Sequence, residues 1–574
     1  MKYPVKDRSC TDCLMAMIFL LSLILVAGTG VYGVLKGNPS NIVQPYDSSS
    51  NACGRDKAKA YPYLYLTTAN PATWGKKNVC VKECPQQDGV KLDCLPNKEV
   101  TACSQIKAIN TFFFANRYCI PQSDFVSDKS MAAFKALKYE KLYADATNSW
   151  RVLLISAGIA IIISFMYVLL LEFCGAVILY LVMLGFLVAM TFLGWYFYSS
   201  SKMIGEGKAQ NSDDSNLYLY LAYGVWGIEA VFLCCMICLC SQIDLATDIV
   251  EMTADYITDV MRVIFVPLIS LTLLGAYLYW AIYSGAMFFS IGEIHHEKGD
   301  IWGSIKWPVY FEYIFYAWAF AFLWHIAYLN NLNMFLLTMI ACVWYFDDDG
   351  KLNYPLTKAL SWAFIYHVGT IAWGSFLLAV IWSIQIVLAY IHKKYKEAEA
   401  IQNKALDWAM GCLQCCAQCF ERLIKYISRH AYVECILKNV GFCKGSQLAF
   451  TAVTSNVLRF SILTGILHLT MIFGNIAIAC SVTAIGYFLL QYEAKLSKVV
   501  FETFGPLIIV FVIAYTISNI FMNIFDVSAD ALLHCYVVDE SDDGVAGPRN
   551  KIGDTLARVD KKAKANGYIE LTNK

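Results

Sequence analysis

One apolar segment of the chain, Leu217–Leu239, carries a carboxylate together with aromatic side chains. Glu229 lies three residues after Trp226 and six after Tyr223. On a helix, residues three apart share a face, so Trp226 and Glu229 would point in the same direction. Aromatic faces attract cations, and a carboxylate nearby adds to this attraction. The spacing therefore indicates a site for a small organic cation, and a carboxylate paired with a neighbouring helix is the alternative.

Three histidines lie within other apolar segments, where an ionisable side chain is costly unless it faces a partner or a water-filled cavity. They are His325, His367 and His468. Histidine changes charge near neutral pH, so His367 and His325 are our candidates for proton transfer. A buried histidine bonded to the next helix is the alternative for each. Gly369 and Gly374 follow His367 and would let another helix approach closely.

Further aromatic side chains could contribute to a cation site. Aromatic residues make up 15% of the chain. Those in the middle of apolar segments are Tyr223, Trp226, Tyr316, Trp318, Trp324, Trp362, Tyr366 and Trp373. Trp and Tyr also form belts at both membrane interfaces, and buried aromatic rings often only pack, so each has a structural alternative.

Helices that cross a lipid bilayer must position these side chains. Ser361–Tyr390 holds one histidine and no lysine, arginine or carboxylate, and about 20 apolar residues are enough to cross the hydrocarbon core. Comparable segments are Leu14–Leu35, Trp150–Leu171, Ala176–Tyr198, Leu217–Leu239, Val260–Tyr283, Val309–Leu329, Asn331–Phe346, Leu458–Leu490 and Phe504–Phe525. Hydrophobic residues reach 58%, charged residues only 16%, and the mean hydropathy is +0.49. The sequence predicts an all-α polytopic membrane protein with about ten transmembrane helices; Val309–Phe346 is alternatively one long broken helix.

Basic residues at the ends of these segments predict the orientation. Lysine and arginine cluster at residues 2–8, 393–404 and 549–564, and such flanks stay in the cytoplasm. We therefore expect both termini in the cytoplasm. The expected divisions are a cytoplasmic N-terminus (1–13), a first transmembrane helix (14–35), a cysteine-rich extracellular loop (36–149), a bundle of about seven spans (150–390), a cytoplasmic cysteine-rich amphipathic region (391–457), two last spans (458–525) and a cytoplasmic tail (526–574).

The expected extracellular loop contains six cysteines. They are Cys53, Cys80, Cys84, Cys94, Cys103 and Cys119. An even number outside the cell points to three disulfides, with fifteen possible connectivities. Cys80 and Cys84 leave zinc open as the alternative, although the loop contains no histidine.

The cysteines expected in the cytoplasm are of a different kind. Cys10 and Cys13 lie beside the first span, and four more follow in the region 391–457, at Cys412, Cys415, Cys416 and Cys419. Unmodified thiols, palmitoylation sites and a zinc site are the three interpretations of the later group. Asp347–Asp349 lacks the rest of a calcium-binding loop and is expected to be a solvated turn. Asp526 and Asp530 are expected to cap or gate the last span.

Seven motifs give the chain a resemblance to a known family. They are DRSCTDC (Asp7–Cys13), KGNPSNIVQPYDSSSNACG (Lys36–Gly54), CVKECP (Cys80–Pro85), YHVGTIAWGS (Tyr366–Ser375), AYVECILKNVGFCKGSQLAF (Ala431–Phe450), NVLR (Asn456–Arg459) and VSADALLHCYVVDESDDG (Val527–Gly544). Together they resemble the choline transporter-like family of solute carriers over nearly the whole chain. The resemblance implies about ten spans, cytoplasmic termini, a disulfide-bearing first loop, and transport of choline or a related amine, exchanged against protons. We expect an integral protein of the plasma membrane.

One segment departs from this resemblance. The family suggests a basic juncture after the fourth span, whereas Ser241–Arg262 holds five carboxylates before its first arginine. Their spacing predicts an amphipathic helix at the cytoplasmic surface with an acidic face. Such a face does not seek anionic lipid, so a protein partner at residues 244–259 or a gating element is expected.

Several function classes are excluded. The formal net charge is zero, which does not supply the basic surface that nucleic acids require. The Walker, GxSxG and HExxH motifs are absent from the sequence, so we expect no enzyme, no cofactor, no metal and no ATP-driven pump. The leading hypothesis is a secondary transporter of choline or a similar small cation in contact with membrane lipids. The alternatives are a structural or accessory subunit that retains the transporter fold and, ranked lower, an ion channel.

Overall fold

The computed structural model describes residues 4–5, 7–38, 45–49, 51–67, 78–97, 100–106, 108–114, 117–121, 149–205, 214–238, 240–295, 304–307, 309–346, 355–397, 404–497 and 504–541. The chain forms two compact units. The first contains Met1–Phe19, Ala144–Leu273 and Ile326–Lys574, and the second contains Leu20–Tyr143 and Leu274–His325.

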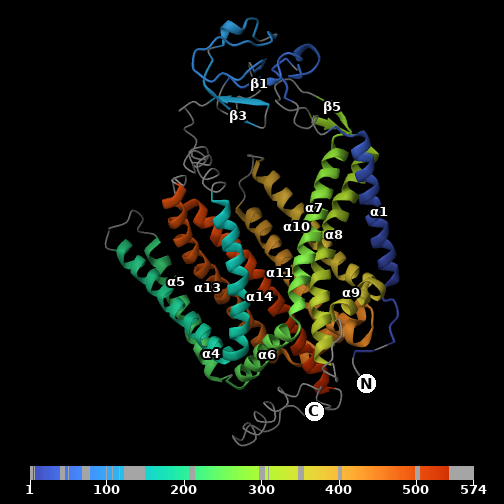
Figure 1. Ribbon diagram of the computed structural model, residues 1–574, viewed down its shortest axis with the longest axis vertical. Coiled ribbons are helices and arrows are strands. Elements are labelled where there is room, and N and C mark those ends of the chain that lie inside the picture. The colour runs from blue at the N-terminus through green and yellow to red at the C-terminus, as the bar shows by residue number, and fades with distance from the viewer. Residues whose placement is uncertain are drawn as a thin grey trace, which may run out of the picture. The chain divides into compact units, whose positions relative to one another are not determined.

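Long helices build the first unit (Figure 1). In chain order the helices are α1 (Cys13–Lys36), α4 (Trp150–Gly205), α5 (Asp214–Cys238), α6 (Cys240–Asp259), α7 (Phe265–Phe289), α8 (Val309–Tyr345), α9 (Pro355–Tyr366), α10 (Val368–Glu397), α11 (Lys404–Lys438), α12 (Phe442–Ser455), α13 (Val457–Ser497) and α14 (Phe504–Ser541). Of these, α1, α7 and α8 have residues in both units. Within the first unit α4 packs against α5, α6, α13 and α14, and α11 packs against α10, α12 and α14.

Nine stretches of helix in the described part of the chain are long and apolar enough to cross a membrane. This confirms a polytopic helical membrane protein. The two short spans expected at Val309–Leu329 and Asn331–Phe346 are wrong, because α8 is one continuous helix of 37 residues. Helix α4, by contrast, is divided at Cys174, which has non-helical dihedral angles (φ −133°, ψ 27°). The two spans expected there are therefore present.

The segment Ser361–Tyr390 is not the single helix that its uncharged sequence predicted. The helix breaks at His367, where α9 ends and α10 begins. The Thr11 backbone N–H donates to the carbonyl of Tyr366 at 2.9 Å. The N-terminal residues therefore satisfy a carbonyl group that the end of α9 leaves open.

Helix α11 runs antiparallel to α10. His392 pairs with Asp407 at 2.7 Å near one end of α10, and Gln385 donates to Glu421 at 2.8 Å nearer its middle. Later residues of α11 thus meet earlier residues of α10. At 1.5 Å per residue, the 35 residues of α11 make a helix roughly 50 Å long. The region 391–457, expected to lie in the cytoplasm, therefore contains a helix that lies along a candidate span.

The N-terminal residues and α14 both contact the end of α11 in the first unit. The backbone N–H of Val5 donates to the carbonyl of Leu437 at 3.1 Å, near the end of α11. Glu434 of α11 in turn accepts from His534 of α14 at 3.1 Å. The first residues and the end of α14 are therefore at the same end of this unit.

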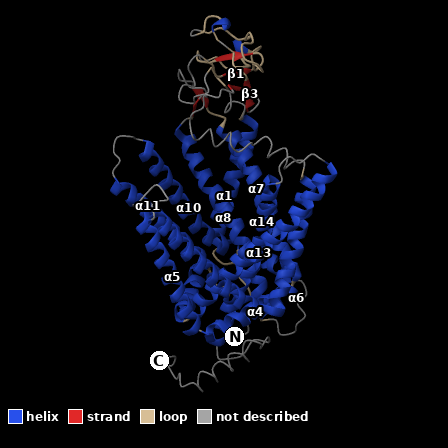
Figure 2. Cartoon of the chain, turned by 90° about the vertical axis from the view of Figure 1, so that its left-hand side faces the viewer, coloured by secondary structure: helices blue, strands red, loops and turns tan. Residues whose placement is uncertain are grey.

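The second unit contains the first loop and parts of three helices. The strands, red in Figure 2, are β1 (Tyr63–Tyr65), β2 (Val79–Val81), β3 (Thr111–Phe114) and β4 (Tyr118–Pro121) in one sheet, ordered β2-β1-β4-β3, and the hairpin β5 (Glu293–His295) and β6 (Ser304–Lys306). All six predicted cysteines are oxidised, as Cys53–Cys80, Cys84–Cys119 and Cys94–Cys103. The disulfide prediction is confirmed. Helix α1 approaches α7 closely, since a Cβ on Gly33 would lie 2.7 Å from the backbone of Phe288.

Candidate functional site

The residues of the first predicted cation site lie between α4 and α5. Glu229 accepts a hydrogen bond from Thr191 Oγ1 at 2.5 Å. Trp226 packs against Gly194, with its ring centroid 5.9 Å from that of Tyr198 and 6.2 Å from that of Tyr223. Trp226 and Glu229 do share a face, and that face is turned to α4. The carboxylate has a partner there, which is the arrangement of the structural alternative.

Trp324 and His325 lie in the second unit, at the end of its part of α8. His325 is buried, and both its ring nitrogens have hydroxyl partners: Ser22 at 2.9 Å and Tyr277 at 2.8 Å. Trp324 is also buried and packs against Phe320. Since both nitrogens are already engaged, a proton added to His325 would need one of these hydroxyls to turn.

His367 lies at the break between α9 and α10, beside the N-terminal segment. Its Nε2 lies 3.0 Å from Arg8 Nη1, and its Nδ1 lies 3.1 Å from Thr11 Oγ1. A guanidinium can only donate, so Nε2 accepts and the ring is neutral with its hydrogen on Nδ1. Tyr366, its neighbour, accepts from Thr11 through its carbonyl oxygen at 3.0 Å.

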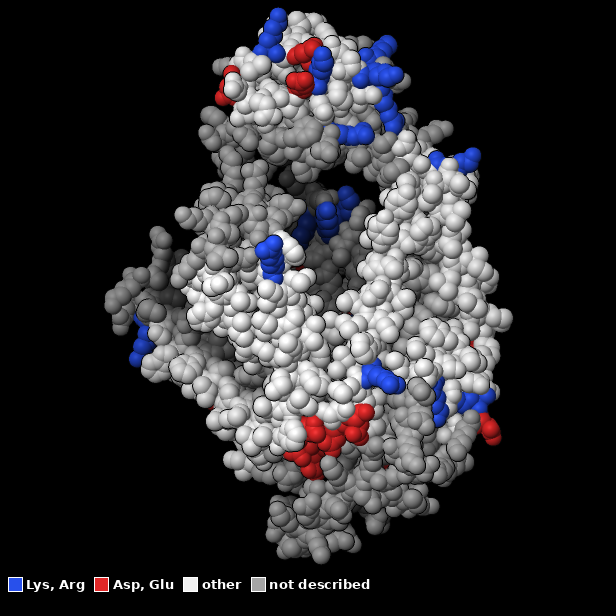
Figure 3. Space-filling model, in the orientation of Figure 1, with Lys and Arg blue, Asp and Glu red and all other residues white. Residues whose placement is uncertain are grey.

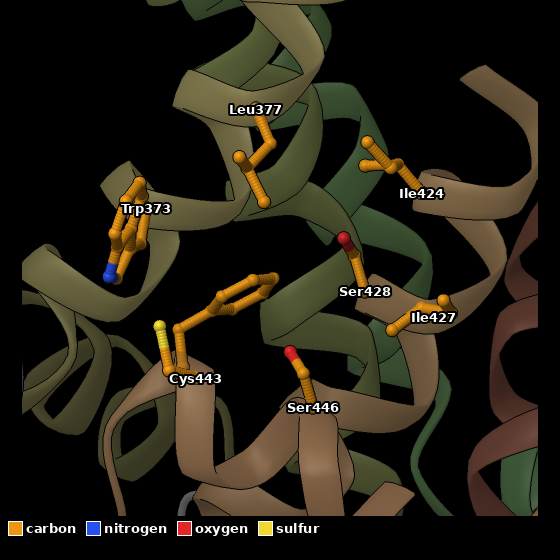
Figure 4. A pocket seen from close by; sticks show the side chains of 8 residues that line it. Trp373, Leu377, Ile424, Ile427, Ser428, Cys443 and Ser446 are labelled. Atoms are coloured by element: carbon orange, nitrogen blue, oxygen red, sulfur yellow. The ribbon is translucent and has the colours of Figure 1, made fainter. Parts of the chain in front are cut away.

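The last of the predicted residues, Trp373, lines a cavity of about 370 Å³ within the first unit. Leu377 joins it from α10, and the other lining residues are Ile424, Ile427, Ser428, Phe442, Cys443 and Ser446. Figure 4 shows Trp373, Ile424 and Ser446 around one space, contributed by three different helices. The walls are apolar and aromatic, with the hydroxyls of Ser428 and Ser446 as polar groups. Apolar walls with a few polar groups are typical of small-molecule sites.

A carboxylate lies one helical turn before this cavity on α11. Glu421 accepts from Trp382 Nε1 at 3.1 Å, from Gln385 at 2.8 Å and from Lys425 at 2.6 Å. Lys425 also lies 5.9 Å from the Trp382 ring centroid. Glu421 and Ser428 were not among the predicted site residues, because α11 was expected to lie outside the membrane. Their signal was the one-sided pattern of apolar residues in a segment too polar to register as a span.

Within the first unit the predicted residues lie in three places. Glu229, Trp226 and Tyr223 are together on α5, His367 and Tyr366 are at the break before α10, and Trp373 is at the cavity. Trp324 and His325 belong to the second unit. Among the described residues, no group of three or more His, Cys, Asp or Glu side chains could hold a metal ion.

The other predicted features also have defined places. Asp526 and Asp530, expected as cap or gate residues, both accept from Arg429, at 2.6 and 2.9 Å. Helix α6 buries Tyr256 and carries Asp259, which accepts from Trp344 at 3.1 Å. Acidic side chains gather on the surface over α6 in Figure 3. Asp347–Asp349 lies outside the described residues.

Comparison with known proteins gives consistent results. A family model described as plasma-membrane choline transporter matches residues 223–541. Choline transporter-like protein 2 of Dictyostelium discoideum is 27% identical, and the match covers 94% of this chain and 92% of that protein. Choline transporter-like protein 4 of Danio rerio is 22% identical over 95% of this chain and 93% of its own length. Choline transporter-like protein 2 of Rattus norvegicus is 23% identical over 97% of this chain and 95% of its own length.

Proposed function

Because the chain belongs to the choline transporter-like family, we propose that it carries choline or a related small organic cation across a membrane as a secondary transporter. The cavity at Trp373 is the observation that supports this function best. A quaternary ammonium group cannot donate a hydrogen bond, so a selective site must rely on aromatic faces and on charge at a distance. Trp373 and Phe442 supply the aromatic faces. Glu421 lies one turn away on α11, and its charge becomes available to the cation when its ion pair with Lys425 opens.

The hydroxyl groups of the cavity fit the other end of choline. Ser428 on α11 and Ser446 on α12 both line it. A serine hydroxyl can donate to or accept from the alcohol of choline, whereas the methyl groups of choline fit against Leu377 and Ile424. In this proposal Tyr366, Tyr223, Trp226, Glu229 and Trp324 are further candidates for contact along the route of the substrate.

We propose that α11 crosses the membrane as a tenth helix. Its antiparallel packing along α10, a candidate span, supports this placement. With ten crossings both termini are on one side, in agreement with the contact of residue Val5 with the end of α11. Basic residues near the chain ends support a cytoplasmic location for that side, in the plasma-membrane protein that we propose.

Exchange against protons is the mode of transport that we propose. The predicted carriers are His367 and His325, each of which has two hydrogen-bond partners. For His367 to bind a proton, the Arg8 guanidinium must first move away from Nε2, because two positive charges would otherwise be adjacent. A proton on His367 would thus be linked to release of the N-terminal segment.

Uptake by the purified protein in liposomes tests this function. Labelled choline should accumulate in a saturable manner, and excess unlabelled choline should compete with it. Uptake no greater than that of protein-free liposomes would contradict transport. It would favour the second candidate, an accessory subunit that binds a protein partner through the acidic face of α6.

A further inference from the structure

A buried group of charged side chains joins α11 to α14. Arg429 Nη1 donates to Asp526 Oδ2 at 2.6 Å and to Asp530 Oδ2 at 2.9 Å. Both aspartates are buried, at 2% exposure each. One arginine nitrogen therefore serves two carboxylates. The second oxygen of each, Oδ1, is buried without a hydrogen-bond partner among the described residues.

Two histidines, a third carboxylate and a lysine continue the group along the same helices. Glu434 pairs with Lys438 at 2.9 Å and with His534 Nε2 at 3.1 Å. The ring of His430 stacks on that of His534, with centroids 5.3 Å apart. His430 is 1% exposed, and neither of its nitrogens has a partner among the residues with assigned positions. We call these seven residues the charge cluster: Arg429, His430, Glu434, Lys438, Asp526, Asp530 and His534.

The formal charge of the cluster is not balanced. Three carboxylates (Asp526, Asp530 and Glu434) face two permanent cations (Arg429 and Lys438), which leaves one negative charge when both histidines are neutral. An uncompensated charge within a membrane protein is costly, and such groups mark ion or proton routes. One bound proton would bring the cluster to neutrality.

A cavity gives one end of the cluster access to water. It has a volume of about 440 Å³, and its lining includes Glu434, Lys438, Asn456 and Glu540. Glu434 bonds to His534, and the ring of His534 stacks on that of His430, the residue next to Arg429. A proton that enters at Glu434 therefore meets a chain of titratable groups, whereas His367 and His325 each already have two partners.

Neighbouring elements add few charges to this cluster. Tyr426 of α11 faces Asp530 and contacts Thr464 of α13. Phe460 of α13 covers both histidine rings, at 5.0 and 5.8 Å between centroids. Tyr256 of α6 faces Ser528, Cys342 of α8 contacts Cys535, and Arg459 of α13 pairs with Glu540.

We propose that the charge cluster, and not the predicted carriers His367 and His325, is the proton-coupling site of this transporter, where one proton binds when the cation leaves and departs when the cation binds. This inference rests on the proposed transport function. Helix α11 connects the two events, because Ser428 lines the cation cavity and the next residue, Arg429, holds the aspartates. A shift of α11 that closes on the cation would change the distances of Arg429 from Asp526 and Asp530.

Asp530→Asn provides the test, because it removes one negative charge and so imitates the protonated cluster. The amide oxygen can still accept from Arg429, and Asp526 still balances the guanidinium. Proteoliposomes would contain a pH-sensitive dye and receive external choline at equal pH on both sides. The wild-type protein should make the interior alkaline as choline enters. Asp530→Asn should lose this signal and still exchange labelled for unlabelled choline, with a raised half-saturation because the protonated form is the one that releases the cation.

The controls separate this proposal from the proposed function. His468→Gln, an exposed histidine on α13, should leave both signals unchanged, and Asp530→Glu should restore proton movement. If Asp530→Asn does not yield folded protein, His430→Gln takes its place with the same expectation. Full choline-driven proton movement in the variant would overturn the proposal, as would choline exchange without proton movement in the wild type. Absence of choline exchange in the wild type would instead refute the transport function.

Discussion

At the scale of residues, the guanidinium of Arg8 shows how the N-terminus is held to the helical unit. It lies 3.6 Å from the ring centroid of Trp362, and its two terminal nitrogens reach His367 and the carbonyl of Ile436. Three partners on different segments thus depend on one side chain. The spacing in the sequence could not predict these contacts, because Arg8 is 359 residues from His367.

Replacing Arg8 with Gln should lower the stability of the folded protein. Hydrogen bonds to charged groups contribute about 2 kcal/mol each, and the buried carbonyl of Ile436 would lose its donor. Arg8→Lys should recover part of the loss, since lysine keeps the charge and lacks the planar fork. Thermal unfolding of the purified protein measures the effect, with Lys444→Gln on the exposed face of α12 as the control. A midpoint equal to that of the control would show that the segment is not held by Arg8.

Glu229 provides a second test at this scale. Glu229→Gln removes the charge and keeps a hydrogen-bond acceptor for Thr191. If Glu229 contacts the cation, this substitution should raise the choline concentration needed for half-maximal uptake. If Glu229 is only a partner of α4, uptake should be unchanged. Thr191→Val is the matched variant, because it removes the hydrogen bond and leaves the carboxylate. Unchanged uptake kinetics in Glu229→Gln would remove Glu229 from the substrate route.

At the scale of elements, α11 joins the two sites that we propose. One face carries Ile424, Ile427 and Ser428 at the cation cavity, and the other carries Arg429 and His430 in the charge cluster. A helix with one uncharged face and one charged face is not apolar overall. Hydropathy therefore did not identify it as a span, although its cysteine and apolar residues gave it one uncharged side.

The position of α11 can be tested with its own cysteines. Cys415, Cys416 and Cys419 are exposed on the protein surface. If α11 crosses the membrane, we expect them to react with a lipid-soluble maleimide and to resist a charged maleimide applied to either side, after hydroxylamine has removed any acyl groups. Lys444→Cys on α12 is the accessible control. Rapid labelling by the charged reagent from the cytoplasmic side would place α11 in the cytoplasm.

Apolar composition predicted where most helices lie. It did not predict where a helix breaks or continues, because that depends on contacts with other segments of the chain. Long uncharged stretches identified α1, α4, α5, α7, α13 and α14. The break at His367 was hidden, because it depends on the N-terminal residues that bond to Tyr366 and His367. In α8 two short spans were predicted, but Asn331 donates to Ser375 of α10 at 3.0 Å and the helix continues.

At the scale of the whole molecule, the two units depend on different forces. The helical unit buries residues such as Phe525 and Tyr432 among long helices, whereas the first loop buries a small core around Leu64 and Val79. A core of that size needs covalent support, and the three disulfides supply it. The even number of cysteines predicted the bonds, but their pairing depends on the sheet, which no spacing rule predicts.

The disulfides should differ in their contribution to the stability of this loop. Cys53–Cys80 closes a sequence separation of 27 residues, and Cys94–Cys103 closes one of 9. In the chain-entropy description the larger closure stabilises by about 1 kcal/mol more. Removing the first bond, as Cys53→Ala with Cys80→Ala, should therefore make the loop more sensitive to proteolysis than Cys94→Ala with Cys103→Ala. Equal cleavage rates for the two variants would contradict this order.

Counterflow of labelled choline in proteoliposomes is the most direct test of whether the Trp373 cavity carries the substrate. Liposomes loaded with unlabelled choline should accumulate external label through the wild-type protein. Trp373→Phe keeps an aromatic face and should retain counterflow with a moderately higher half-saturation. Trp373→Ala removes the face and should raise the half-saturation by about tenfold or more, since cation–π contacts contribute up to about 2 kcal/mol when desolvated. Unchanged half-saturation in Trp373→Ala, with counterflow intact, would show that the cation passes elsewhere.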